Sequence, residues 1–149
     1  MTKIRITKQF TFEMAHVLKD YDGPCRNVHG HSYELFVTLI GEPLQDESSP
    51  KYGMVMDYKD LKTIVKENVI NKFDHSLVLS SRHNETSIKN LKSEFEKLIV
   101  VDYQPTNENL IIDIANILKP LLPKNASLYK LKLRETATAY SEWHSEDNE

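Results

Sequence analysis

Apolar and polar side chains alternate from Ile4 to Met14, and almost every even position in this stretch is apolar. This period of two is typical of a strand with one buried face. A second alternating stretch covers residues 33–39, after a loop of turn-forming residues from Lys19 to Asn27. We expect the two strands to pair as a hairpin with a long connection.

Apolar residues at helical spacing occur twice further along the chain. Asp57 is a good N-cap, and the residues after it predict an amphipathic helix that reaches about Val69. Thr106 follows a proline and is a possible N-cap of a second helix, which Pro120 and Pro123 limit at its other end. Both helices have one apolar face that can cover a sheet.

The remaining segments complete a single domain over residues 1–149. A short polar helix over 88–98 and a short strand over 98–101 are expected between the two main helices, and closing strands over 128–134 and 138–144. Neither an internal repeat nor a second domain is apparent. The order of elements predicts an α+β fold.

Composition narrows the class of partner. The net charge of -3 argues against a broad nucleic-acid surface, which normally needs clustered Lys and Arg. The chain contains no run of about 18 apolar residues of the kind that crosses a membrane. We therefore expect a cytoplasmic protein with a small-molecule partner.

Cys25 is the only cysteine, so an intrachain disulfide is excluded. Its side chain acts as a thiol, either as a small buried hydrophobe or as a reactive group. The residue type alone leaves both interpretations open.

Strand phase places three histidines on core-facing rows. His16 continues the apolar phase of the first strand, while His29 and His31 continue the row of Tyr33 in the second strand. Pairing of the strands would bring the three imidazoles to one end of the hairpin. Three histidines and one open position match a catalytic zinc site, whereas the alternative is a set of hydrogen-bonded core histidines.

Two acidic positions also stand out. Glu135 ends an apolar row in a predicted strand, so its carboxylate needs a partner, which is either a ligand with N–H donors or an internal Lys or Arg. Asp74 and His75 are adjacent and could form a proton-handling pair if the chain turns there. The alternative is that Asp74 caps a helix and His75 is exposed.

Six motifs in order resemble one enzyme family. They are FEMAH (12–16), CRNVHGHSY (25–33), GMVMDYKDLK (53–62), FDHSLVL (73–79), PTNENL (105–110) and LRET (133–136). Together they resemble the 6-pyruvoyl tetrahydropterin synthase and 6-carboxy-tetrahydropterin synthase family. The combination of Cys-x-x-x-His-Gly-His with an upstream His and a downstream Asp-His is far more specific than any one pair.

The resemblance implies a tunnelling fold. In this fold a four-stranded antiparallel sheet carries two main helices on one face, and oligomerisation closes the sheets into barrels. The typical assembly is a homohexamer of two trimers with active sites between subunits. One subunit alone would not complete such a site.

The resemblance also implies the chemistry. The family substrate is 7,8-dihydroneopterin triphosphate, whose side-chain hydroxyls would bind Zn²⁺ held by His16, His29 and His31. Cys25 matches the catalytic thiol that takes up a carbon-bound proton. Asp74 and His75 match the dyad that handles a second proton transfer. The pterin-binding residues of the family are matched by Glu135, Thr106 and Glu108.

The family divides into two reactions after loss of triphosphate. Pyruvoyl enzymes stop at 6-pyruvoyl tetrahydropterin, whereas carboxy enzymes release acetaldehyde and leave 6-carboxy-tetrahydropterin for queuosine biosynthesis. Three residues separate Cys25 from His29, which resembles the bacterial carboxy enzymes, and we expect that activity. The alternatives are the pyruvoyl reaction, a pterin-binding module without turnover, and a purely structural zinc ion.

One segment departs from the usual family length. Residues 81–97 form a polar insertion between two of the motifs. Its role is open between trimming of the pocket, extension of the subunit interface and surface decoration.

Overall fold

The computed structural model describes residues 2–149 and contains one six-stranded sheet in the order β4-β3-β1-β2-β5-β6. The strands are β1 (Ile4–His16), β2 (His29–Gly41), β3 (Ser76–Ser80), β4 (Leu98–Val101), β5 (Ala126–Thr136) and β6 (Ala139–His144). The helices are α1 (Tyr58–Val65), α2 (Asn71–Phe73), α3 (Glu85–Glu94) and α4 (Asn107–Leu118). A π-helical turn, η2 (Lys66–Ile70), joins α1 to α2, and short 3₁₀ turns lie at η1 (Pro24–Arg26), η3 (Lys119–Leu121) and η4 (Ser145–Asp147).

The expected hairpin of the first two strands is confirmed. β1 and β2 pair antiparallel over their whole length, with Phe12 opposite Tyr33 and His16 opposite His29. Residues that face one another across a ladder point to the same side of the sheet. The apolar rows of the two strands therefore form one continuous face, as their alternation predicted.

The expectation of four antiparallel strands is wrong, because β3 and β4 add two more strands beside β1. β3 runs parallel to β1, with Met14 opposite Ser76, and β4 runs parallel to β3, with Leu77 opposite Leu98. Parallel neighbours need a crossover of about a dozen residues, usually with a helix. The insertion, which contains α3, supplies this crossover.

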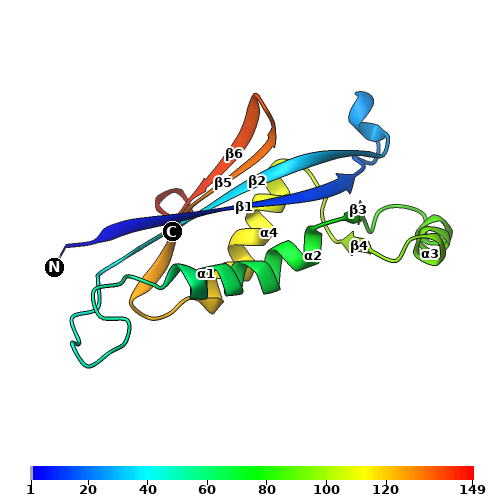
Figure 1. The fold of residues 1–149 in the computed structure, drawn as a ribbon. Coiled ribbons are helices and arrows are strands. Elements are labelled where there is room, and N and C mark those ends of the chain that lie inside the picture. The colour runs from blue at the N-terminus through cyan, green and yellow to red at the C-terminus, as the bar shows by residue number, and fades with distance from the viewer. Residues whose placement is uncertain (1) are drawn as a thin grey trace.

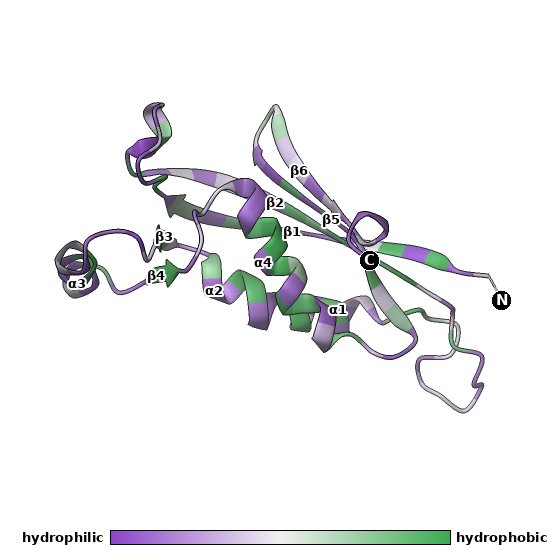
Figure 2. Ribbon diagram, turned by 180° about the vertical axis from the view of Figure 1, so that it is seen from behind, coloured by the Kyte–Doolittle hydropathy of each residue, from purple (hydrophilic) through white to green (hydrophobic). Residues whose placement is uncertain are grey.

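Both predicted main helices form and cover one face of the sheet (Figure 1). Asp57 Oδ1 accepts a hydrogen bond from the Lys59 N–H at 2.8 Å, and Thr106 Oγ1 accepts one from the Asn109 N–H at 3.2 Å, so both expected N-caps are confirmed. Figure 2 shows hydrophobic residues gathered on α4. The core includes Tyr33, Leu35, Leu61, Phe73, Ile114 and Leu133.

α3 lies apart from the other helices, at the β3–β4 end of the sheet (Figure 1). It covers Glu85–Glu94 rather than the expected 88–98, and Asn84 Oδ1 caps its start by accepting from the Thr86 and Ser87 N–H groups. None of its residues is buried. No helix among residues 2–149 has both the length and the apolar character needed to cross a membrane.

Candidate active site

The three histidines meet at one end of the β1–β2 hairpin, as strand phase predicted. His16 is the last residue of β1, and His29 is the first residue of β2 and its direct partner. His31 follows two residues later on the same face. One ring nitrogen from each residue lies within 4.8 Å of the others, so the trio could hold a metal ion.

Two backbone carbonyls fix the orientation of two of these rings. The His16 Nδ1–H donates to the carbonyl oxygen of Pro105 at 2.7 Å, and the His29 Nδ1–H donates to that of Asn27 at 2.8 Å. Each imidazole is then left with its Nε2 atom as the acceptor or ligand nitrogen. The two Nε2 atoms lie 3.0 Å apart and converge.

Burial favours the neutral, metal-binding form of two of the three rings, His16 and His31. Desolvation of the His16 ring lowers its pKa to about 4, with smaller contributions from His29 and His31, against the opposing hydrogen bond to Pro105. Desolvation also lowers the pKa of His31, although the charge of Glu135 opposes this shift. Neutral imidazole is the ligand form of histidine.

His31 supplies the test of whether a metal fits. Its Nε2 atom is buried and has no hydrogen-bond partner within residues 2–149, although Glu135 Oε1 lies 3.2 Å away in an orientation that makes no hydrogen bond. An orphaned buried nitrogen beside two converging ring nitrogens is explained by a bound cation. Ordinary core histidines would not leave these atoms unpaired, so the trio fits a metal ion.

A cavity of about 330 Å³ opens beside the trio, between η1, the start of α4 and the β5–β6 hairpin. Its lining combines His16 with four other residues that the sequence singled out, namely Cys25, Thr106, Glu108 and Glu135. Cys25 is half-buried at the cavity wall, not a fully buried hydrophobe. Its loop is closed by the N–H of Leu18, two residues after β1, which donates to the Cys25 carbonyl at 3.0 Å.

Glu135 does not form the internal Lys or Arg pair that was the alternative to a ligand. Among the described residues its carboxylate lies beside the His31 ring and forms no ion pair with a Lys or Arg, and its side chain is about one-fifth exposed. The carboxylate therefore faces the cavity with oxygens that can accept N–H donors from a ligand.

Sequence analysis did not identify two polar residues of this cavity, Asn107 and Ser141. The Asn107 Nδ2–H donates to the Leu133 carbonyl at 2.9 Å, which leaves Asn107 Oδ1 buried without a partner in the described chain. Ser141 lies opposite Leu133 in the ladder, and its Oγ atom is likewise unpartnered there. Buried polar atoms are normally satisfied, so both indicate a polar ligand. They become visible only in tertiary structure.

Tyr33 Oη is a fourth unpartnered buried atom near the site, after His31 Nε2, Asn107 Oδ1 and Ser141 Oγ. Burial, with the nearby charges of Glu135 and Cys25, raises the pKa of Tyr33, so the hydroxyl stays neutral. A buried hydroxyl without a hydrogen bond costs about 1–3 kcal/mol.

The Tyr33→Phe variant removes only this hydroxyl. The ring stays stacked on Phe12, with 5.0 Å between ring centroids. We expect the free energy of unfolding of the metal-free protein to rise by about 1 kcal/mol, measured by urea denaturation. A clear loss of stability instead would mean that the hydroxyl has a partner, such as a buried water.

The chain turns at His75, and this turn brings the side chains of Asp74 and His75 together as the expected pair. His75 Nδ1 lies 3.0 Å from Asp74 Oδ2, and His75 has a φ of 58°, in the left-handed region. Asp74 follows α2 and begins no helix, so it is not an N-cap, whereas the exposed His75 of that alternative is confirmed. The Glu13 N–H donates to Asp74 Oδ1 at 2.8 Å and, with smaller effects of His75 and Lys97, lowers the pKa of Asp74.

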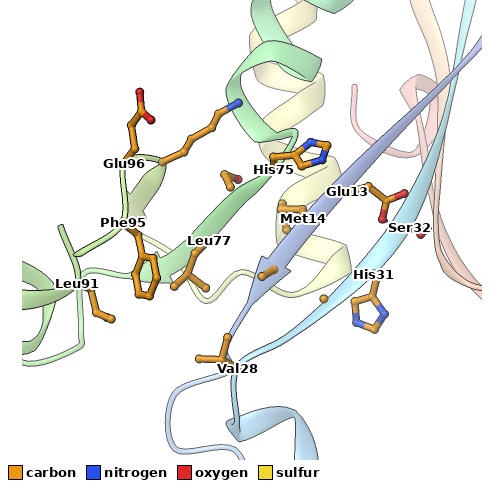
Figure 3. Close-up of a pocket in the computed structure, with 14 residues that line it drawn as sticks. Glu13, Met14, Val28, His31, Ser32, His75, Leu77, Leu91, Phe95 and Glu96 are labelled. Atoms are coloured by element: carbon orange, nitrogen blue, oxygen red, sulfur yellow. Dashed lines mark hydrogen bonds between the residues drawn. The ribbon is translucent and has the colours of Figure 1, made fainter. Parts of the chain in front are cut away.

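The pair does not share the cavity of Cys25. His75 lines a second groove of about 1240 Å³ together with Glu13 and Ser32, whose phase is opposite to that of His16. His31 of the trio also borders this groove, whereas Cys25 does not. Figure 3 shows His75 on the side of Glu13, with Leu77, Leu91 and Phe95 gathered on the other side. The groove therefore lies against the sheet face opposite α1 and α4.

Comparison with known proteins gives a consistent result. Residues 5–146 match the family model of 6-pyruvoyl tetrahydropterin synthase. The chain is 35% identical over 141 residues to the 6-carboxy-5,6,7,8-tetrahydropterin synthase of Haemophilus influenzae, covering 93% of this chain and 97% of that protein. It is 31% identical to the 6-pyruvoyl tetrahydrobiopterin synthase of Dictyostelium discoideum, covering 95% and 96%.

The fold is similar to a solved structure as well. The 6-pyruvoyl tetrahydropterin synthase of Caenorhabditis elegans superposes with a TM-score of 0.68 at 26% identity, covering 97% of this chain and 96% of that chain. The six-stranded mixed sheet and its helices are thus compatible with the tunnelling fold.

Proposed function

The chain belongs to the 6-pyruvoyl tetrahydropterin synthase family, and from this premise we propose that it is a zinc-dependent 6-carboxy-5,6,7,8-tetrahydropterin synthase. This lyase converts 7,8-dihydroneopterin triphosphate and one water into 6-carboxy-tetrahydropterin, acetaldehyde and triphosphate for queuosine biosynthesis. The observation that carries the proposal is one cavity beside the histidine trio, whose lining joins His16 to Cys25 and Glu135. Because Cys25 must remain a thiol, we place the enzyme in the reducing cytoplasm.

The metal is Zn²⁺, held by His16, His29 and His31. Three neutral imidazoles with a further open position match a catalytic zinc site. When bound, zinc acts as a Lewis acid that makes the substrate's side-chain hydroxyls and the adjacent carbon-bound proton more acidic. The carbonyls of Pro105 and Asn27 hold two of the ligand rings in place.

The polar atoms of the cavity bind the pterin. Glu135 accepts N–H groups of the ring, and Thr106 and Glu108 line the adjacent wall. Asn107 Oδ1 and Ser141 Oγ satisfy their unused hydrogen bonds on the same ring. A pterin has both donors and acceptors along its edge, which suits this mixture of groups.

Cys25 and the Asp74–His75 pair handle the protons. Cys25, as thiolate, takes the carbon-bound proton of the substrate side chain, because it lines the cavity next to His16. Asp74 stays ionised and orients His75, which carries the second proton transfer. A pterin-binding module without turnover would need neither group.

Cys25 and His75 act on the same substrate only if they come from different subunits, because within one chain they line separate cavities. We therefore propose a homohexamer of two trimers, in which a neighbour brings its Asp74–His75 pair to the cavity of Cys25.

Complementation tests this arrangement. The Cys25→Ala and His75→Ala variants should each be inactive, and unfolding and refolding them together should restore activity in up to about a quarter of the sites. The controls are each variant refolded alone and the size of the mixed oligomer. Mixed oligomers that stay inactive would contradict a shared site.

Product identification distinguishes the two family reactions. Mass spectrometry of the pterin formed from 7,8-dihydroneopterin triphosphate should give 6-carboxy-tetrahydropterin. The spacing of Cys25 and His29 and the 35% identity to the Haemophilus influenzae protein support this product. The pyruvoyl reaction is the second candidate, supported by the match to the Dictyostelium discoideum protein, and it would leave 6-pyruvoyl tetrahydropterin.

A further inference from the structure

The turn that carries Asp74 and His75 is unusual for its backbone. A non-glycine residue at a φ of 58° is uncommon, and such a conformation persists only where surrounding contacts enforce it. Two hydrogen bonds join the turn to β1. The His75 N–H donates to the Glu13 carbonyl at 2.6 Å, and the Glu13 N–H donates to Asp74 Oδ1 at 2.8 Å.

Lys97 holds the other side of this turn. Its Nζ atom donates to the Asp74 carbonyl at 2.5 Å and to the Asn71 carbonyl at 2.6 Å. Its own carbonyl accepts from the Leu77 N–H at 3.0 Å. One residue therefore contacts the chain just before and just after His75.

The position of Lys97 suits this role. The carbonyls at the end of α2 lack helical partners, and a cation is favourable at a helix C-terminus. Lys97 comes from the end of the insertion, directly before β4, where pairing with β3 fixes its backbone. The insertion thus delivers an ammonium group to the turn, and its side chain is only partly exposed.

We propose that Lys97 is a positioning residue that locks the turn and thereby sets the orientation of the Asp74–His75 pair. This inference rests on the proposed function, in which that pair transfers a proton. It also gives residues 81–97 a role, because the crossover that contains α3 places Lys97 beside the pair. The His75 ring itself is largely exposed, so its direction depends on this backbone turn.

Kinetics of the Lys97→Met variant test the proposal. Methionine keeps an unbranched side chain but removes the charge and the two hydrogen bonds. We expect kcat to fall by about 10- to 100-fold, because a small misplacement of a proton-transfer group is costly, while KM and zinc content stay unchanged. Lys97→Arg should restore most of kcat, since a guanidinium can donate to both carbonyls. Lys92→Met, at an exposed lysine of α3, is the matched control.

Hydrogen exchange provides a readout that needs no turnover. In Lys97→Met, NMR should show that protection of the Glu13 and His75 amides drops by about tenfold or more, while that of Leu35 in the central strand β2 is unchanged. Unchanged exchange at these two amides would overturn the proposal that Lys97 holds the turn in place. A variant that loses stability but keeps full kcat would show that Lys97 is only structural and would also overturn the proposal. A wild-type protein without turnover would instead refute the proposed function, and exchange would still test the lock.

Discussion

Replacing Cys25 by alanine is expected to lower kcat by about 1000-fold. General acid–base catalysis contributes about 10²–10⁴-fold, and Cys25 is the thiol that lines the cavity beside His16 and Glu135. The variant should bind zinc and dihydroneopterin as the wild type does, because neither the histidine trio nor Glu135 is altered. Steady-state kinetics with metal analysis and a pterin titration measure the three quantities.

Cys25 is the only cysteine in the chain, so chemistry at the thiol offers an independent check. Alkylation of the wild-type protein should abolish turnover in proportion to the thiol modified. The Cys25→Ala protein treated in the same way is the control for reaction at other residues. Full turnover by a Cys25→Ala variant that binds zinc and pterin would remove Cys25 from the mechanism.

Loss of the metal is the second large effect that we expect. The His31→Ala variant removes the ligand whose Nε2 atom is otherwise unpartnered, so zinc content should fall close to zero and turnover by about 1000-fold or more. The variant should still fold, because the core is built from apolar residues of the sheet and of α1 and α4. Atomic absorption measures the zinc content, and thermal melting shows whether the variant is folded.

His144→Ala provides the matched control, because His144 lies on β6 and pairs with Glu142. This variant should keep its zinc and its activity. A chelator that inactivates the wild type without unfolding it would agree with a catalytic ion. Unfolding upon chelation would support the alternative of a purely structural zinc ion.

The fold was predictable wherever one face of an element is buried. Alternation from Ile4 to Met14 and helical spacing after Asp57 and Thr106 identified elements that pack on one core. β3 escaped prediction because it is short and nearly all buried, with no alternating pattern. α3 buries no residue, so no apolar period marks its start and end.

The site was predictable where strand phase determines geometry. His16, His29 and His31 extend apolar rows of two paired strands, so their convergence follows from the register of the hairpin. The turn at His75 could not be predicted, since its left-handed backbone depends on contacts with Glu13 and Lys97 that are distant in sequence. Orphaned atoms such as Asn107 Oδ1 are likewise a property of packing and not of spacing.

The most direct test of the proposed activity is the amount of acetaldehyde released per triphosphate from 7,8-dihydroneopterin triphosphate by the zinc-loaded protein. We predict equal amounts of the two products, and neither from protein stripped of metal. Triphosphate without acetaldehyde would contradict the carboxy reaction in favour of the pyruvoyl reaction. If the zinc-loaded protein releases neither product, the proposal that it is an enzyme acting on this substrate is wrong.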